Sequence, residues 1–122
     1  MIIGVGTDII EIQRVNGVIE RNKRFLEKTF TGLEIEMFKA KAMKVETIAG
    51  NFAAKEAISK AVGSGFRDFS FKDIEVLRDE LGKPIVNLSE KVINKIGSEN
   101  IKINLSISHN KSSAIAFAIL EV

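Results

Sequence analysis

The stretch VETIAGNFAAKEAISKAVG, residues 45–63, predicts the longest helix of this chain. It is rich in alanine and free of proline, both of which favour a helix, and Gly63 suits the left-handed residue that often ends one. Projected at about 100° per residue, the apolar side chains gather on one face, and Glu56 falls in the middle of that face. Lys60 lies one helical turn further along it. A carboxylate in such a position is unfavourable unless it is paired or binds a metal.

Glu56 therefore has two interpretations. It forms a buried structural ion pair with Lys60, or it is a metal ligand whose neighbouring ammonium group is ready for phosphate oxygens. Asp8 is a second isolated carboxylate, because it is the only charge in the run IIGVGTDII, residues 2–10, which predicts a buried strand. Asp8 either caps the helix that follows or, together with Glu56, suits a hard cation such as Mg²⁺, which takes its remaining oxygens from water and substrate phosphates.

The composition limits the kinds of site that this chain can hold. Its 122 residues, 45% of them hydrophobic, exclude disorder and predict one folded domain over residues 1–122. The absence of Cys and the single His exclude a thiolate zinc site, a cysteine nucleophile and a multi-histidine metal site, so any metal is expected to have oxygen ligands. A domain of this size has little interior room, and its active site is expected to be shallow or shared between chains.

Charge and hydropathy narrow the choice of partners and location. The formal net charge of +2 is too small to indicate nucleic acid as a partner, although it leaves room for a local basic patch. No segment approaches the roughly 20 apolar residues of a membrane-spanning helix, and the N-terminal run lacks the basic start of a signal peptide. We therefore expect a cytoplasmic protein with no membrane contact.

Shorter signals outline the rest of the fold. They predict, in chain order, a polar helical segment over 11–28 interrupted near Asn22, a helix from Thr31 to Ala42, strands over 69–78 and 85–88 joined by a turn at 81–84, a short helix from Ser89 to Gly97, and strands over 101–108 and 114–120. The last strand is almost continuously apolar, which indicates a central position. Together these elements predict an α+β fold in which a largely antiparallel sheet is packed with a long central helix.

Four short motifs follow one another along the chain. They are Gly6-Thr7-Asp8-Ile9-Ile10-Glu11-Ile12 with Arg14 after it, Phe52-Ala53-Ala54-Lys55-Glu56-Ala57 continued by Lys60-Ala61 and Gly63, Gly82-Lys83-Pro84, and Ser106-Ile107-Ser108-His109. In this order, from position 4 to about 118, the sequence resembles the holo-[acyl-carrier-protein] synthases, the small phosphopantetheinyl transferases. The resemblance implies a 4′-phosphopantetheinyl transferase-like fold.

The resemblance also implies an activity. Members of the family transfer the 4′-phosphopantetheine group of coenzyme A to a serine of apo acyl carrier protein and release adenosine 3′,5′-bisphosphate. The residues that match Asp8 and Glu56 bind Mg²⁺ together with the pyrophosphate of coenzyme A, which agrees with the residue-based interpretation. Lys60 is expected to stabilise the leaving bisphosphate or to donate a proton to it. The base that accepts the serine proton is Glu56, Asp8 or a Mg²⁺-bound water.

Further residues are implied to bind coenzyme A. The residues that match His109 and the Gly82-Lys83-Pro84 turn lie near the nucleotide portion in the family, and Gly63 and Gly65 match its phosphate-side loop. Asn51 stands where many members carry an arginine that meets the 3′-phosphate. We therefore predict weaker discrimination between coenzyme A and its 3′-dephospho form than in an arginine-bearing relative. The cations available to replace that arginine are Lys44 and Lys55.

A basic segment follows the first predicted strand. Arg14, Arg21 and Arg24 are spaced 7 and 3 residues apart there, so that they can lie along one side of a helix. They form either a merely solvated face or, as the resemblance favours, a docking surface for acyl carrier protein, which is strongly acidic.

The family forms trimers with active sites between subunits, so the resemblance implies a homotrimer. We expect Asp8, Glu56 and Lys60 to come from one subunit and the His109 hairpin from its neighbour.

Two other functions stay open on the residues alone. One is a Mg²⁺-dependent phosphohydrolase that uses the same carboxylates with water as nucleophile, and the other is a non-catalytic coenzyme A-binding module. The carrier that accepts the group is a fatty-acid or a secondary-metabolic one.

Overall fold

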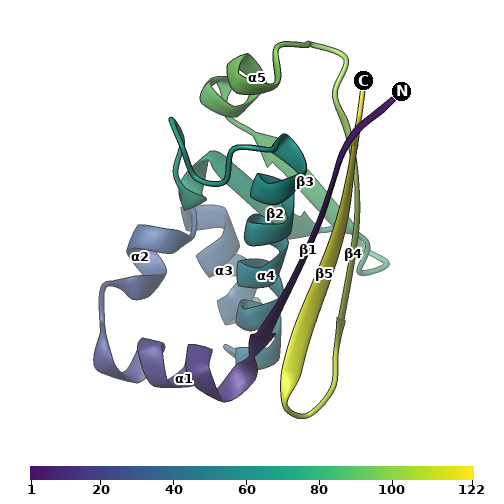
Figure 1. The fold of residues 1–122 in the computed structure, drawn as a ribbon. Coiled ribbons are helices and arrows are strands. Elements are labelled where there is room, and N and C mark those ends of the chain that lie inside the picture. Colours follow the sequence, from purple (N-terminus) through teal and green to yellow (C-terminus); the bar gives the residue numbers. More distant parts are fainter.

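The computed structural model describes residues 1–122 and contains five α-helices and two antiparallel sheets (Figure 1). In chain order the elements are β1 (Ile2–Glu11), α1 (Ile12–Arg21), α2 (Phe25–Thr29), α3 (Gly32–Ala40), α4 (Val45–Val62), the 3₁₀ turn η1 (Phe71–Asp73), β2 (Ile74–Arg78), β3 (Pro84–Leu88), α5 (Glu90–Ile96), β4 (Lys102–His109) and β5 (Ser113–Glu121). None of the helices is both long enough and apolar enough to cross a membrane.

The five strands form a three-stranded and a two-stranded sheet. The larger sheet has the order β1-β5-β4, with Asp8 of β1 opposite Ala116 of β5. Strands β2 and β3 pair only with each other. The predicted α+β fold with antiparallel strands is confirmed, and so is the central place of the most apolar strand, β5. The strands are divided between two antiparallel sheets, however, where one largely antiparallel sheet was expected.

Helix α4 lies along the inner face of the larger sheet, in the middle of the molecule (Figure 1). It spans the predicted residues and ends at Gly63, whose φ of 97° is left-handed. Ala57 of the helix packs in one core cluster with Ala116 and Ala118 of β5. Small side chains on both surfaces let the helix and the sheet approach closely.

Strand β1 approaches α4 more closely than a side chain would permit. A Cβ atom on Gly6 would lie 1.8 Å from the carbonyl oxygen of Ala57, and one on Gly4 would lie 1.7 Å from that of Ala61. Both distances are far shorter than a van der Waals contact, so only glycine fits at these two positions. Because Asp8 is the second residue after Gly6, the close approach brings it beside the C-terminal half of α4.

The outer face of the larger sheet is apolar and uncovered in one chain. Val5 and Ile9 of β1 are 53% and 67% exposed, and their cross-strand neighbourhood includes Ile115 and Phe117 of β5, which are 44% and 41% exposed. Since side chains alternate along a strand, these residues share the face opposite α4. A contiguous apolar patch of this kind indicates a contact surface.

Two local predictions differ from the structure. The strand expected to start at Phe69 begins at Ile74, because Ser70 and Asp73 form a capping box that turns the chain through η1 first. Ser89 precedes α5 as predicted, but its side chain makes no capping hydrogen bond. In contrast, the interruption near Asn22 is confirmed, since this residue separates α1 from α2.

Candidate active site

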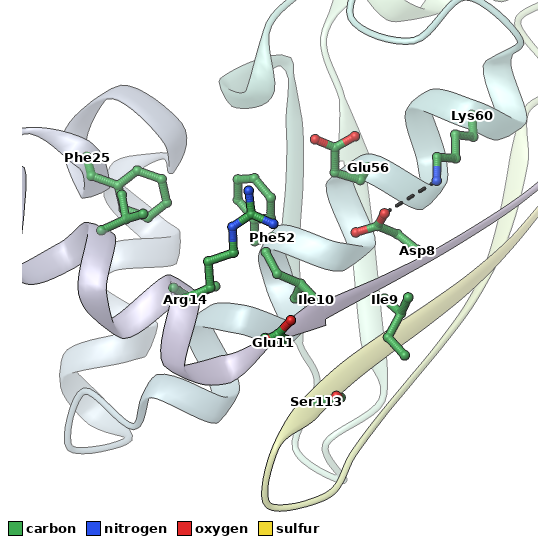
Figure 2. A pocket seen from close by; sticks show the side chains of 12 residues that line it. Asp8, Ile9, Ile10, Glu11, Arg14, Phe25, Phe52, Glu56, Lys60 and Ser113 are labelled. Carbon is green, nitrogen blue, oxygen red and sulfur yellow. Dashed lines mark hydrogen bonds and ion pairs between the residues drawn. The ribbon is translucent and has the colours of Figure 1, made fainter.

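A pocket of about 720 Å³ lies among β1, α1, α2 and α4 (Figure 2). Asp8 from β1 and Glu56 and Lys60 from α4 line it together, so the three predicted catalytic residues meet although they are far apart in the sequence. The other side of the pocket is largely apolar and includes Phe25 and Phe52. One wall can therefore bind charged oxygens while the other accepts apolar groups.

Lys60 and Asp8 form an ion pair across the junction of α4 and β1. The Lys60 Nζ atom lies 3.3 Å from Asp8 Oδ1 (Figure 2). It also donates a hydrogen bond of 2.9 Å to the carbonyl oxygen of Thr7. The alternative interpretation, a buried Glu56–Lys60 pair, is therefore wrong. Asp8 is not a helix cap either, because it lies within β1 and the residue before α1 is Glu11.

Glu56 is the half-buried carboxylate of the pocket and forms none of the four ion pairs of the chain. Burial raises the pKa of its carboxyl group above the usual range, and the negative charge of Asp8 raises this pKa further, against the opposing effect of Lys60. Asp8 and Glu56 therefore repel each other when both are ionised, and a bound cation would remove this repulsion. The third carboxylate in the pocket, Glu11, is exposed at its edge.

The donors in this pocket suit a hard cation with incomplete protein ligation. No group of three or more His, Cys, Asp or Glu side chains is close enough to hold a metal ion by itself. Asp8 and Glu56 offer two oxygen-bearing side chains, which is the number that Mg²⁺ often takes from a protein when a substrate phosphate supplies further oxygens. The residues present therefore fit Mg²⁺ bound together with a phosphate-bearing substrate, and they do not fit a metal cage.

A second pocket, of about 300 Å³, contains several residues that the sequence assigns to coenzyme A. Gly82, Pro84 and His109 line it together with part of the N-terminal half of α4. Lys41 and Arg78 also line it, and neither was singled out from the sequence. They were missed because the motifs do not include them, and only the tertiary fold brings β2 and the end of α3 to this place.

The remaining predicted coenzyme A residues lie outside both pockets. Gly63 and Gly65 follow α4 with positive φ angles of 97° and 63°, in the loop after the helical turn that carries Lys60. Lys44 precedes α4, and Lys83 lies in the turn between β2 and β3. Neither lysine lines either pocket.

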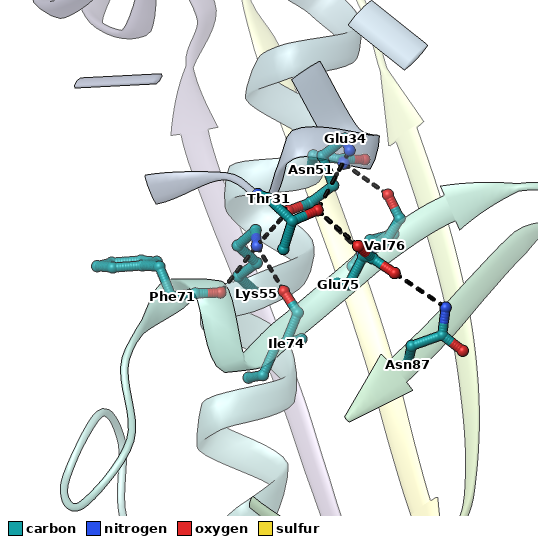
Figure 3. Close-up of polar contacts among 9 residues, drawn as sticks. All are labelled: Thr31, Glu34, Asn51, Lys55, Phe71, Ile74, Glu75, Val76 and Asn87. Carbon is teal, nitrogen blue, oxygen red and sulfur yellow. Dashed lines mark hydrogen bonds and ion pairs between the residues drawn. The ribbon is translucent and has the colours of Figure 1, made fainter. Parts of the chain in front are cut away.

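Asn51 is buried and cannot reach a ligand. It is 0% exposed, and its Nδ2 atom donates to Glu34 Oε2 at 3.1 Å and to the carbonyl oxygen of Val76 at 2.8 Å (Figure 3). Lys55 is likewise 0% exposed and donates to Glu34 Oε1 at 2.7 Å, which excludes it as a replacement for the missing arginine. The predicted coenzyme A contact of Asn51 is therefore wrong.

Lys55 and Glu34 form the buried ion pair of the molecule. The Lys55 ammonium group also donates to the carbonyl oxygens of Phe71 and Ile74, so it joins α4 to η1 and β2 (Figure 3). Burial lowers the pKa of Lys55, and the Glu34 carboxylate raises it. The capping box of Thr31 and Glu34 was visible in the sequence and is confirmed, but its second role as the partner of a buried lysine was not.

The basic residues proposed for docking lie on two elements. Arg14 and Arg21 are exposed and two turns apart on α1, and Arg14 also lines the first pocket. Arg24 does not continue this helix face, because α1 ends at Arg21 and Arg24 is the residue that precedes α2. The prediction that all three share one side of a helix is wrong for Arg24.

Comparison with known proteins gives consistent matches along the chain. Residues 4–118 match the 4′-phosphopantetheinyl transferase superfamily. The holo-[acyl-carrier-protein] synthase of Clostridium beijerinckii is 57% identical over 121 residues, covering 99% of this chain and 98% of that protein.

Two crystal structures have the same fold. The holo-[acyl-carrier-protein] synthase of Neisseria meningitidis superposes with a TM-score of 0.89 at 33% identity and covers all of both chains. The enzyme of Helicobacter pylori, solved in complex with coenzyme A, superposes with a TM-score of 0.84 at 35% identity, covering 96% of this chain and 99% of that one.

Proposed function

This chain belongs to the 4′-phosphopantetheinyl transferase superfamily, among the holo-[acyl-carrier-protein] synthases, and we propose that its reaction depends on Mg²⁺ held by Asp8 and Glu56. The reaction transfers 4′-phosphopantetheine from coenzyme A to a serine of apo acyl carrier protein and releases adenosine 3′,5′-bisphosphate. The observation that carries the proposal is the meeting of two carboxylates and one ammonium group in a single pocket.

The two carboxylates have the charge and the surroundings that a divalent cation requires. The raised pKa of the Glu56 carboxyl group reflects its burial and its repulsion by Asp8, and a divalent cation held by these two side chains would offset both effects. Bound there, Mg²⁺ would neutralise charge on the pyrophosphate of coenzyme A as the phosphorus–oxygen bond to the leaving group breaks.

Lys60 is proposed to bind the leaving bisphosphate. Its ammonium group is held at the pocket by Thr7 and Asp8 but keeps an exposed side, so one of its protons remains free for a phosphate oxygen. From this position Lys60 can stabilise the negative charge that develops on the leaving group or donate a proton to it.

A mass-spectrometric assay tests the reaction and its metal dependence. The protein is incubated with coenzyme A and apo acyl carrier protein, with either Mg²⁺ or a chelator, and the mass of the carrier is recorded. We expect the carrier to gain one phosphopantetheine group only when Mg²⁺ is present. Release of phosphate without modification of the carrier would indicate a phosphohydrolase, and binding of coenzyme A without either product would indicate a binding module.

We propose that acyl carrier protein docks on α1 beside the first pocket. Arg14 and Arg21 are exposed on this helix, and Arg14 reaches the pocket in which the serine must react. Opposite charges on two partners accelerate their encounter and orient them, and the effect weakens as salt is added.

The Arg14→Glu/Arg21→Glu protein is expected to show a KM for acyl carrier protein that is higher by about tenfold or more, with a flatter dependence on salt. The KM for coenzyme A should change little. Steady-state kinetics at several salt concentrations measure both constants. Lys91→Glu on α5 is the matched control, since this exposed lysine lies at the far end of the molecule from α1 (Figure 1). Carrier kinetics equal to those of the control would contradict the docking site.

We also propose a homotrimer with active sites between subunits. The apolar outer face of the larger sheet, which includes Val5, Ile9 and Phe117, gives the chain a surface suited to self-association. The catalytic residues and the predicted nucleotide-binding residues line different pockets of one chain. A coenzyme A molecule that uses Asp8 and Glu56 of one subunit would then place its nucleotide against the His109 pocket of the next.

Mixed trimers test this arrangement. Glu56→Gln and His109→Ala proteins are each expected to be strongly impaired, but refolding them together should restore intact sites. With random assembly, about a quarter of the sites combine an intact Glu56 with an intact neighbouring His109. Mixing Glu56→Gln with Asp8→Asn is the control, because both defects fall on the same side of every site. Recovery in the control, or none with His109→Ala, would contradict a site shared in this way.

A further inference from the structure

The second pocket contains a cation without an anionic partner. Arg78 is half-buried at the end of β2, and the only hydrogen bond of its guanidinium group runs from Nη1 to the carbonyl oxygen of the adjacent Leu77, at 3.3 Å. None of the four ion pairs of the chain includes it. Burial lowers the pKa of its guanidinium group, and the more distant charge of Glu34 raises this pKa.

A guanidinium group in these surroundings has lost water without gaining a carboxylate. It has five N–H donors in a planar fork, and nearly all of them are free for a ligand. The pocket supplies two further groups that can carry positive charge, Lys41 and His109, against the single carboxylate of Glu46. Its hydroxyl groups, from Thr47 and Ser106, are additional donors. The chemistry of the pocket therefore suits an anion with several oxygens, such as a phosphate monoester.

The position of Arg78 is linked to that of Asn51. The Asn51 side chain reaches only as far as Val76, because its Nδ2 atom donates a hydrogen bond of 2.8 Å to the carbonyl oxygen of that residue. Arg78 is the next residue of β2 on the same face as Val76, about 7 Å further along the strand. Arg78 consequently projects beside α4 into the pocket that the short Asn51 side chain does not reach.

Coenzyme A has one phosphate group that the first pocket does not use. Its pyrophosphate is the reacting group and belongs with Asp8, Glu56 and Lys60, whereas its 3′-phosphate is a monoester at the nucleotide end. We propose that Arg78 binds this 3′-phosphate and sets the preference of the enzyme for coenzyme A over 3′-dephospho-coenzyme A. The inference rests on the proposed function, in which the nucleotide lies in the second pocket. It reverses the expectation from Asn51, since the cation missing at position 51 is supplied from β2.

Ligand binding and turnover test the role of Arg78 separately. Calorimetry compares the affinity for adenosine 3′,5′-bisphosphate with that for adenosine 5′-monophosphate, and steady-state kinetics compare coenzyme A with its 3′-dephospho form. The parent protein is expected to prefer the 3′-phosphorylated ligand in both measurements by about 10- to 100-fold, which is the range for a charge-assisted contact.

Arg78→Met is expected to abolish most of this preference, because only the affinity for the 3′-phosphorylated ligands should fall. Arg78→Lys should keep part of the preference, because the lysine ammonium group still supplies a point charge. Lys91→Met, which removes an exposed cation outside the pocket, should keep all of it. An unchanged preference in Arg78→Met, or an equal loss of affinity for both ligands, would overturn the assignment. If the parent protein prefers the bisphosphate but transfers nothing to the carrier, the proposed function fails while the role of Arg78 as a phosphate ligand stands.

Discussion

The Glu56→Gln protein is expected to lose at least about 100-fold in the turnover number for carrier modification while it folds as well as the parent. Glutamine has the size of glutamate but lacks the negative charge that a divalent cation requires. Nothing in the fold depends on that charge, because Glu56 forms no ion pair and is disfavoured by burial and by Asp8. Removal of the charge should therefore leave the free energy of unfolding in the presence of a chelator unchanged or slightly higher.

Glu56 is expected to make the stability of the folded protein depend on pH in a predictable direction. Its pKa is raised in the folded state, so the folded protein binds more protons than the unfolded chain between the two pKa values. The contribution of Glu56 to stability in the absence of metal therefore falls as the pH rises through that range, and the Glu56→Gln protein lacks this dependence. Protons also compete with Mg²⁺ for Glu56, so the affinity for Mg²⁺ should weaken on acidification.

Two measurements check the expected behaviour of the Glu56→Gln protein. Thermal unfolding with a chelator and with Mg²⁺ should show stabilisation by Mg²⁺ in the parent protein and little in Glu56→Gln. Carrier modification by mass spectrometry gives the loss of turnover. Lys91→Gln removes an exposed charge elsewhere and should behave as the parent does in both. A Glu56→Gln protein with turnover within about threefold of the parent would contradict the proposed metal site.

Gly6→Ala is expected to destabilise the fold by at least about 3 kcal/mol and to reduce activity in whatever protein still folds. The added Cβ would lie 1.8 Å from the Ala57 carbonyl oxygen, so β1 and α4 must separate to make room for it. Shortening the Ala57 side chain would give no relief, because the clash is with the main chain. Separation of β1 from α4 would also move Asp8 away from Glu56, and the apparent affinity for Mg²⁺ should fall.

Chemical denaturation of Gly6→Ala and a matched glycine variant measures the effect. Gly32→Ala is the control, because a Cβ atom at this first residue of α3 meets nothing within 4 Å and alanine favours a helix. We expect its free energy of unfolding to stay within about 1 kcal/mol of the parent value or to rise. Equal stabilities of the two variants would show that the close approach of β1 and α4 is not required.

Helix α4 shows which features of the site were predictable from the sequence and which were not. Its ends were predicted correctly, because the absence of proline and the terminal glycine are local signals. The projection of Glu56 onto a packing face also singled out a residue that lines the first pocket together with Asp8 and Lys60. The projection assumes one buried face, however, and α4 is covered by the larger sheet on one side and by α1 and β2 on others. Lys55 is therefore buried more deeply than Glu56, although the pattern gave no sign of it.

The unpredicted features depend on contacts between distant segments. Glu34 and Lys55 are 21 residues apart in the chain, and nothing in the local pattern of either segment names the other as its partner. Arg78 is a similar case. In the sequence it is only the last residue of a predicted strand, and nothing in the local pattern indicates that it lines the second pocket. The division of the strands into two sheets was missed for a related reason, since pairing depends on neighbours that alternation along one strand does not specify.

The two ends of the chain are joined by main-chain hydrogen bonds. The terminal ammonium group of Met1 donates to the carbonyl oxygen of Val122 at 2.7 Å, and the N–H group of Val122 donates to Met1 at 2.9 Å. Both ends lie at the edge of the sheet away from α1 (Figure 1). A linker of a few residues would therefore close the chain into a ring with little loss of entropy, and the chain could be opened elsewhere, for example between α5 and β4. The same fold is thus expected from a chain in which these segments follow one another in a different order.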